Sequence, residues 1–444
     1  MSYIKFAKNI FTVGFLDFLG IIQGLVLLSL ITKNLSAGDY GVWSQVRITM
    51  GLVVSLTFLG LHEALIRFIP GERDEGNVRE GVYSSVFLVG FINAAVSLLL
   101  VLFSAHAASF LRIDQVFVTL LSLIIMVESL NTMLLVVVRA KQKIGKYFWF
   151  VASKLMAEMG LVAAMVFLGY GILGAVIAYA AVKALLLLFL AFYLIRNIGF
   201  TFPRFSVVKQ YLSFGIPTMA DGFAYWMVTS SDRYLVAFFL GIVFVGYYVP
   251  AYSIAYLLSA FIFPVSFVLS VTLPKLFDQN NMVEVKNYLA HSLKYFLAVM
   301  IPAAFLVSLL SKQLLLVFST KEIADNAYFV VPFITASILL YGTSYFFSQI
   351  LALFKKTKTI AFIWVTAACL NVWLNIIFIP ALGILGAAIT TFMAYLLAFL
   401  LIHYFASKQM RFAIEWGFIF KVFASSVVSG FLIMLLNVFI FFLL

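Results

Sequence analysis

The chain of 444 residues is 65% hydrophobic and only 10% charged, with a formal net charge of +12. Soluble globular domains carry charge on roughly a quarter of their residues, so this composition excludes a water-soluble fold and indicates that lipid is the solvent. The single cysteine, Cys369, excludes an intramolecular disulfide and a cysteine metal cluster. The first apolar stretch, residues 6–31, is too long for a signal peptide and lacks a small-residue cleavage site, so we expect a retained membrane helix.

Apolar stretches long enough to cross a hydrocarbon core of about 30 Å recur along the whole chain. The loops between them are short, which leaves no room for a soluble catalytic or binding domain. We therefore predict an all-α, polytopic membrane protein. Thirteen spans are expected, at residues 7–32, 42–69, 81–103, 116–138, 147–168, 172–195, 210–238, 246–271, 287–310, 327–352, 360–380, 384–405 and 416–443.

The basic residues concentrate in alternate loops. With a cytoplasmic N-terminus, the inside loops hold eighteen Lys and Arg residues and the outside loops four. This is the charge bias of cytoplasmic loops, so the sequence predicts a multi-pass protein of the cell (cytoplasmic) membrane whose N-terminus is cytoplasmic. The same distribution argues against nucleic-acid binding, which would gather the positive charge on one surface.

One helix pair is repeated within the chain. The sequence Gly-Ile-Leu-Gly-Ala at Gly171–Ala175 returns 212 residues later at Gly383–Ala387. Each copy follows an apolar span that begins after a basic loop, at residues 139–146 and 355–358 respectively. An internal duplication is the simplest explanation.

The duplication and the linker at residues 196–209 predict two halves. Leu35–Trp43 also aligns with Leu240–Tyr248, at the turn between the first and second helix of each half. We predict a six-helix bundle at residues 1–200, a second at 201–406, and one additional transmembrane helix at 407–444.

Ionisable residues within the spans are the candidates for function, because each costs roughly 2.5 to 3.5 kcal/mol at a helix centre. Lys154 and Glu158 are four residues apart on one helical face, so they form either a self-satisfied ion pair or part of a transport site. Lys183 has no opposite charge three or four residues away and needs a partner on another helix or an anionic ligand. Glu128 is a further candidate, with Asn131 as a plausible hydrogen-bond partner.

The remaining ionisable residues lie closer to the ends of their spans or are less distinctive. Asp232 and Arg233 can pair locally, and Arg47 lies one turn from an outer end. Glu63 follows His62, and a carboxylate beside a titratable group is one way to build a proton or sodium coupling site. Asp17 and Asp221 are further acids within spans. The sequence has no metal-ligand spacing, nucleophile elbow or phosphate loop, so we predict a protein that is not an enzyme and holds no metal or cofactor.

Four short segments carry a family resemblance: Leu-Ser-Ala-Gly-Asp-Tyr-Gly at residues 35–41, Ala-Leu-Ile-Arg-Phe-Ile-Pro at 64–70, Ser-Asp-Arg-Tyr-Leu at 231–235, and the two Gly-Ile-Leu-Gly-Ala copies. With them the sequence resembles the polysaccharide (Wzx-type) flippases of the multidrug/oligosaccharidyl-lipid/polysaccharide (MOP) superfamily. The resemblance implies a V-shaped, MATE-like pair of six-helix bundles around a central cavity. Such a protein moves a polyprenyl-pyrophosphate-linked oligosaccharide repeat unit outward by alternating access, for cell-surface polysaccharide biosynthesis.

The resemblance also implies roles for the charged residues. The pyrophosphate-facing set would be Arg47, Lys154, Lys183 and Arg233, and the acidic partners or coupling groups would be Asp17, Glu63, Glu128, Glu158 and Asp221. Coupling to a proton or sodium gradient would replace any cofactor. The expected partners are the lipid-linked oligosaccharide, membrane lipid, a polysaccharide polymerase and chain-length machinery.

Two other classes remain open. A multidrug exporter of the same superfamily would need an acidic cavity for organic cations, whereas the deep residues here have mixed charge. A polytopic glycan polymerase or transferase would carry a long outer loop or an acidic loop motif, and the outer loops here are short.

Overall fold

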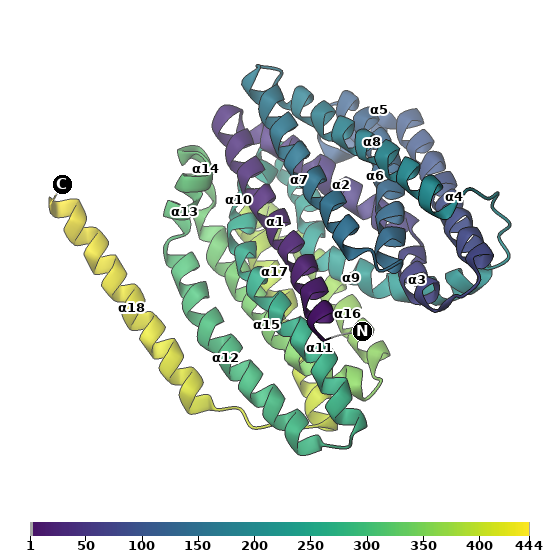
Figure 1. The fold of residues 1–444 in the computed structure, drawn as a ribbon. Coiled ribbons are helices and arrows are strands. Elements are labelled where there is room, and N and C mark those ends of the chain that lie inside the picture. Colours follow the sequence, from purple (N-terminus) through teal and green to yellow (C-terminus); the bar gives the residue numbers. More distant parts are fainter. Residues whose placement is uncertain (1–2, 444) are drawn as a thin grey trace. The chain divides into compact units, whose positions relative to one another are not determined.

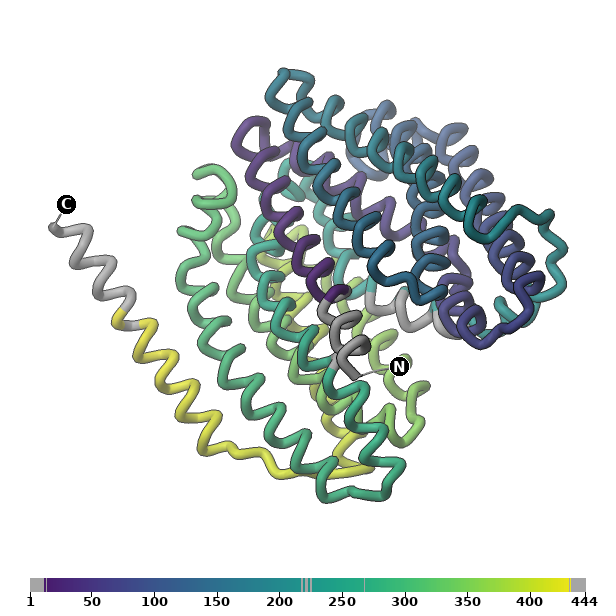
Figure 2. Tube along the Cα trace, in the orientation of Figure 1, coloured from purple at the N-terminus to yellow at the C-terminus, as the bar shows by residue number. Residues whose placement is uncertain are grey.

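The computed structural model describes the backbone of residues 3–443, and Figure 2 draws the residues whose placement is uncertain in grey. Side chains are described for this range except at residues 3–11, 13, 217–218, 220–222, 224–225, 267, 431 and 433–443. Every regular element in residues 3–443 is a helix, which confirms the predicted all-α class (Figure 1). The chain divides into two compact units, Met1–Gly246 and Tyr247–Leu444.

The first unit contains nine α-helices, one 3-10 helix and the start of α10. In order they are α1 (Tyr3–Asn34), α2 (Ala37–Thr57), α3 (Leu61–Phe68), η1 (Ile69–Gly71), α4 (Glu75–Leu102), α5 (Ser104–Leu111), α6 (Gln115–Ala140), α7 (Ile144–Phe167), α8 (Gly171–Ile198) and α9 (Val208–Leu240).

The second unit takes up α10 at Tyr247 and continues to the end of the chain. Its elements are α10 (Ile242–Tyr256), η2 (Leu257–Phe261), α11 (Ile262–Asp278), α12 (Met282–Leu309), α13 (Ser311–Phe318), α14 (Lys321–Ala327), η3 (Tyr328–Val330), α15 (Val331–Leu353), α16 (Thr357–Leu382), α17 (Ile384–Gln409) and α18 (Trp416–Leu443).

Within the described residues, ten helices are long and apolar enough to cross a membrane. The number rises to eleven if the helices Ala37–Thr57 and Leu61–Gly71, which meet at a bend of 59°, are counted together as one broken span. The bend occurs at Leu59 and Gly60, both of which have positive φ. The two other predicted spans are helices as well: α9 has 33 residues, and α18 contributes a shorter apolar helix at Trp416–Gly430 in the searched range. The protein is therefore a multi-pass membrane protein.

The repeated helix pair has the same local structure in both copies. α7 packs against α8, and α16 packs against α17. Gly171 and Gly383 open the second helix of each pair with φ of +60° and +64°, a conformation that favours glycine. Three residues later, Gly174 and Gly386 lie so close to the preceding turn that a Cβ atom would clash with Tyr170 or with the Phe378 carbonyl. Both glycines of the repeated motif are thus explained by the turn.

The duplication extends to the helices before this pair. α4 and α12 each have 28 residues, and each is followed directly by an eight-residue helix, α5 or α13, that begins 207 residues later in the second unit than in the first. The turns from α6 into α7 and from α15 into α16 also share five backbone hydrogen bonds at a spacing of 213 residues. Between this turn and the repeated glycine motif the second copy is one residue shorter than the first, which explains the change from 213 to 212 across the pair.

Contacts place α9 with the helices before it, so the compact units meet at Gly246 rather than at the linker near residue 200. Gly60 and Gly215 bring α3 and α9 too close for a Cβ atom on either residue, and the Phe68 and Tyr211 rings stack 5.2 Å apart. The predicted division into two six-helix bundles and a terminal helix stays a prediction. In the second unit, α18 packs along α12, with the Phe305 and Phe423 rings 5.2 Å apart.

Candidate functional site

Four charged side chains from α6, α7 and α8 meet inside the first unit. The Lys183 ammonium lies 2.7 Å from Glu128 Oε2 and 3.2 Å from Glu158 Oε1. The Lys154 ammonium lies 2.9 Å from Glu128 Oε1. All four residues occupy the middle of their helices, which are labelled in Figure 1. We call this group the charge network.

Two amide side chains hydrogen-bond to residues of the charge network. Gln23, in the middle of α1, donates to Glu158 Oε2 at 2.7 Å and to the Leu155 carbonyl at 3.4 Å. Asn131 donates to the Lys183 carbonyl at 2.8 Å, whereas its own Oδ1 is buried without a hydrogen-bond partner among the described residues. Asn131 therefore secures the backbone of α8, and the expectation that it hydrogen bonds to Glu128 is wrong.

The charge network has an enclosed part and an accessible edge. Only 1% of the Lys183 side chain and 3% of the Glu158 side chain are exposed, against 12% for Glu128 and 15% for Lys154. Two ammonium groups face two carboxylates, so the formal charges balance, as buried charges at membrane depth require. We call Lys154 and Glu128 the accessible edge of the charge network, and Lys183 and Glu158 its enclosed part.

The ion pairs run between helices rather than along one helix. Lys154 and Glu158 satisfy the spacing of an intrahelical pair, yet in the described structure Lys154 contacts Glu128 on α6 and Glu158 contacts Lys183 on α8. The alternative of a self-satisfied Lys154–Glu158 pair is therefore wrong. Each charged side chain pairs with one on a neighbouring helix, so the charge network joins α6, α7 and α8. The hydrogen bond from Gln23 to Glu158 connects α1 to this group.

Aromatic rings connect Arg47 to the charge network. The Lys183 ammonium lies 4.2 Å from the centre of the Tyr179 ring, which meets the Trp43 ring edge-on at 5.1 Å. The half-buried Arg47 guanidinium lies 5.8 Å from the centre of the Trp43 ring. Cations attract ring faces, so Arg47 and Lys183 are held on one aromatic path from α2 to α8.

The other predicted site residues lie elsewhere. Glu63 pairs with His62 at 3.6 Å, and half of its side chain is exposed. Arg233 is buried on α9, lies 3.2 Å from Asp232, and donates to the Thr229 carbonyl. Asp17 is exposed on α1, and the side chain of Asp221 lies outside the described residues. Of the nine predicted residues, the structure thus brings together Glu128, Lys154, Glu158 and Lys183, with Arg47 close by.

Sequence reasoning missed three residues that contact the charge network or the aromatic path beside it: Gln23, Trp43 and Tyr179. Gln23 is a strongly polar residue within the first apolar span, which is the one signal that marks it. Trp43 and Tyr179 cannot be distinguished in sequence from the many other aromatic residues. Among the described residues, no group of three or more His, Cys, Asp and Glu side chains could hold a metal ion.

The fold is shared with solved structures of membrane transporters, one of them a member of the MOP superfamily. The structure is similar to that of a lipid II flippase, MurJ, in an inward closed conformation, with a TM-score of 0.78, 18% identity, and coverage of 97% of this chain and 93% of that chain. It is also similar to an inward-facing multidrug resistance MATE family transporter, with a TM-score of 0.68, 15% identity, and coverage of 89% and 95%. These likenesses confirm the predicted fold.

The sequence comparisons identify the family within that superfamily. A family model described as polysaccharide biosynthesis protein matches residues 30–328, so the chain belongs to this family. The probable low-salt glycan biosynthesis flippase Agl15 of Haloferax volcanii is 23% identical to the chain, over 97% of this chain and 89% of that protein. The predicted resemblance to the polysaccharide flippases of the MOP superfamily is thereby confirmed.

Proposed function

We propose that this protein flips a polyprenyl-pyrophosphate-linked oligosaccharide repeat unit across the cytoplasmic membrane by alternating access, for cell-surface polysaccharide biosynthesis. Family membership supports the pathway, and the names of MurJ and Agl15 agree with a flippase. The observation that carries the substrate class is the charge network: two lysines and two glutamates held in the middle of three apolar helices. Charges at that depth are costly and are a mark of transport sites.

The accessible edge of the charge network suggests how the headgroup binds. Among the described residues, Lys154 has one carboxylate partner, Glu128. Glu128 forms a second ion pair, with Lys183. A pyrophosphate group can therefore take over the Lys154 ammonium while Glu128 keeps its second cation. Charge-assisted hydrogen bonds of this kind are roughly twice as strong as neutral ones.

Lys183 has a different role in this proposal. It is enclosed and contacts both carboxylates, so it positions Glu128 and Glu158 and does not touch the substrate. Arg47, half-buried beside Trp43, is the second residue that we assign to the headgroup.

The test compares two lysines in a cell that depends on this protein for its surface glycan. Lys154→Ala should reduce surface glycan at least tenfold while the amount of membrane-inserted protein stays near normal, because Glu128 retains Lys183. Lys358→Ala is the control, since Lys358 is an exposed residue at the start of α16 and its loss should change neither quantity.

Normal glycan output from Lys154→Ala would contradict the binding role. Unimpaired glycan together with increased sensitivity to organic cations in the deletion strain would instead favour a multidrug exporter.

Coupling to a proton or sodium gradient and a cytoplasmic N-terminus are further parts of the proposal. The orientation follows from the eighteen-to-four charge bias of the loops. Single cysteines at Lys143 and Lys356 in a Cys369→Ser background should both resist an impermeant thiol reagent in intact cells. Labelling of both would contradict this orientation.

The coupling ion is tested in proteoliposomes by dissipating the proton gradient and the sodium gradient separately. Uphill transport should stop only when the gradient of the coupling ion is dissipated.

A further inference from the structure

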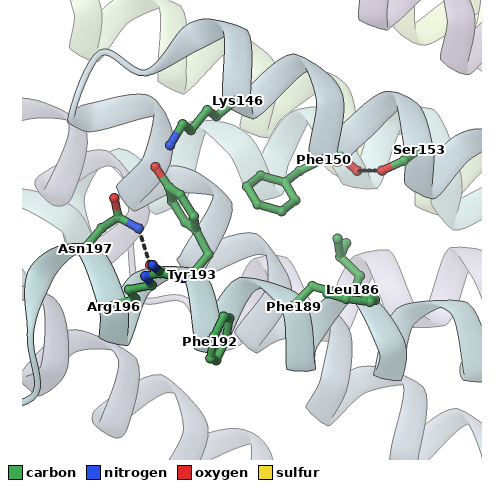
Figure 3. A pocket seen from close by; sticks show the side chains of 9 residues that line it. All are labelled: Lys146, Phe150, Ser153, Leu186, Phe189, Phe192, Tyr193, Arg196 and Asn197. Atoms are coloured by element: carbon green, nitrogen blue, oxygen red, sulfur yellow. Dashed lines mark hydrogen bonds between the residues drawn. The ribbon is translucent and has the colours of Figure 1, made fainter.

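A groove of about 530 Å³ lies between the first turns of α7 and the last turns of α8 (Figure 3). Lys146, Tyr193, Arg196 and Asn197 supply polar atoms at one end. Phe150, Leu186, Phe189 and Phe192 supply its apolar wall. None of the described residues that line the groove carries a carboxylate. It is separate from the charge network, which lies in the middle of the same helices.

The polar end of the groove holds cations and a hydroxyl group that could bind an anion. The Lys146 ammonium rests 4.7 Å from the centre of the Tyr193 ring, and neither Lys146 nor Arg196 has an ion pair among the described residues. The Tyr193 hydroxyl is buried and has no hydrogen-bond partner among the described residues. Figure 3 shows this hydroxyl pointing toward the Lys146 ammonium. A buried donor without a partner is costly, so an acceptor that joins all three groups would satisfy it.

The position of the groove suits a lipid. Lys146 is the third residue of α7 and Arg196 is in the last turn of α8, so the cations lie at the ends of membrane-crossing helices, where headgroups lie. Phe189 and Phe192 leave 66% and 67% of their surface exposed along the apolar wall. Basic pockets between transmembrane helices favour anionic headgroups, and exposed rings beside them favour acyl chains.

The second copy of the helix pair lacks two of these three donors. The residues at the matching positions of α16 and α17 are Thr359 for Lys146, Phe405 for Tyr193 and Lys408 for Arg196. The Lys408 ammonium lies 4.2 Å from the centre of the Tyr404 ring. One cation remains there, without the lysine or the hydroxyl, so the donor set is particular to α7 and α8.

We propose that the groove between α7 and α8 is a binding site for the phosphate headgroup of an anionic glycerophospholipid. Lys146 and Arg196 contact the phosphate oxygens, Tyr193 donates its hydroxyl to one of them, and an acyl chain follows Phe189 and Phe192. A glycerophospholipid is chosen because it is the abundant anionic lipid at this depth, and a single phosphodiester satisfies the three donors.

The test is native mass spectrometry of the purified full-length protein titrated with phosphatidylglycerol or phosphatidylcholine of identical acyl chains. The protein should retain one phosphatidylglycerol at least tenfold more tightly than phosphatidylcholine. Lys146→Ala/Arg196→Ala should abolish that preference, since each basic residue near the surface contributes roughly a fivefold gain for an anionic lipid. Tyr193→Phe, which removes only the hydroxyl, should weaken phosphatidylglycerol binding by about threefold.

The control is Lys358→Ala/Lys408→Ala, which removes two exposed basic residues at the matching ends of α16 and α17 and should leave the preference intact. Equal retention of the two lipids, or an unchanged preference in the Lys146→Ala/Arg196→Ala protein, would overturn the proposal. Tighter retention of a polyprenyl phosphate than of phosphatidylglycerol at the same residues would overturn the choice of lipid. None of these outcomes depends on whether the protein transports an oligosaccharide.

Discussion

The centre of α6–α8 in the first unit and the centre of α15–α17 in the second share a backbone but differ in chemistry. At the matching positions, Glu128 corresponds to Tyr341, Glu158 to Asn371 and Lys183 to Tyr395. In the second unit, Tyr341, Tyr395 and Trp364 form a cluster with ring centres 5.8 to 5.9 Å apart. Asn375 donates to Asn371 Oδ1 at 3.0 Å.

The difference shows that this helix arrangement does not need charges at its centre. Rings that meet edge-on stabilise the second unit through apolar burial, at no desolvation cost for ions. The first unit bears that cost at four positions. The fold alone therefore does not require the charge network, which agrees with the proposed transport of a charged substrate.

The largest expected effect comes from removing one charge from the enclosed part. Lys183→Met leaves Glu158 with Gln23 as its one remaining partner among the described residues, and should lower the free energy of unfolding by about 3 to 5 kcal/mol. Tyr395→Phe at the matching position should cost about 1 kcal/mol or less. Membrane-inserted protein and the midpoint of thermal unfolding measure both. Equal tolerance of the two substitutions would remove the distinction between the units.

A paired substitution sharpens this result. Lys183→Met/Glu158→Gln removes the stranded carboxylate and should recover at least half of the lost stability, because replacing both members of a buried ion pair is far less costly than breaking it. Failure of the second substitution to rescue the first would mean that Lys183 acts through packing alone.

An intermediate effect is expected at Gln23. Gln23→Leu removes the 2.7 Å hydrogen bond to Glu158 and should cost about 1.5 to 3 kcal/mol, the range for hydrogen bonds to charged groups. Ser153→Ala is the control on α7, since Ser153 is exposed and donates only to the Phe150 carbonyl of its own helix. If both substitutions shift the unfolding midpoint equally, α1 is not held by the charge network.

The smallest effect tests what the two units have in common. Gly171→Ala and Gly383→Ala each place a Cβ atom on a residue with positive φ and should each cost about 1 kcal/mol. Gly160→Ala is the control, because a Cβ at this helical glycine meets no atom within 4 Å, and it should be neutral or slightly stabilising. Unequal costs at Gly171 and Gly383 would show that the two turns are not equivalent.

The sequence predicts the repeated parts of the fold better than the polar contacts. Five identical residues reveal the duplicated pair, since the turn at Gly171 and Gly383 needs its glycines for local reasons. The bent span is predicted less well: the bend at Leu59 and Gly60 breaks one predicted span, and nothing in the sequence predicts positive φ for a leucine.

The partners in the charge network depend on how neighbouring helices are rotated, which spacing along one helix cannot give. The four-residue interval between Lys154 and Glu158 suggests an intrahelical pair, yet each residue meets a partner on another helix. Lys183 needs a partner from elsewhere, as its isolation in the sequence indicates, and finds two. Gln23 is overlooked because it carries no charge.

We propose that the accessible edge of the charge network serves transport and that its enclosed part serves stability. The most direct test is the translocation rate of a pyrophosphate-linked oligosaccharide lipid in proteoliposomes containing equal amounts of folded Lys154→Gln or Lys183→Met/Glu158→Gln protein. We expect at least a tenfold loss of rate for Lys154→Gln, which corresponds to a barrier change of about 1.4 kcal/mol. We expect the paired variant to keep a rate within about threefold of that of the unsubstituted protein. Normal translocation by Lys154→Gln protein, with loss in the paired variant, would contradict this proposal.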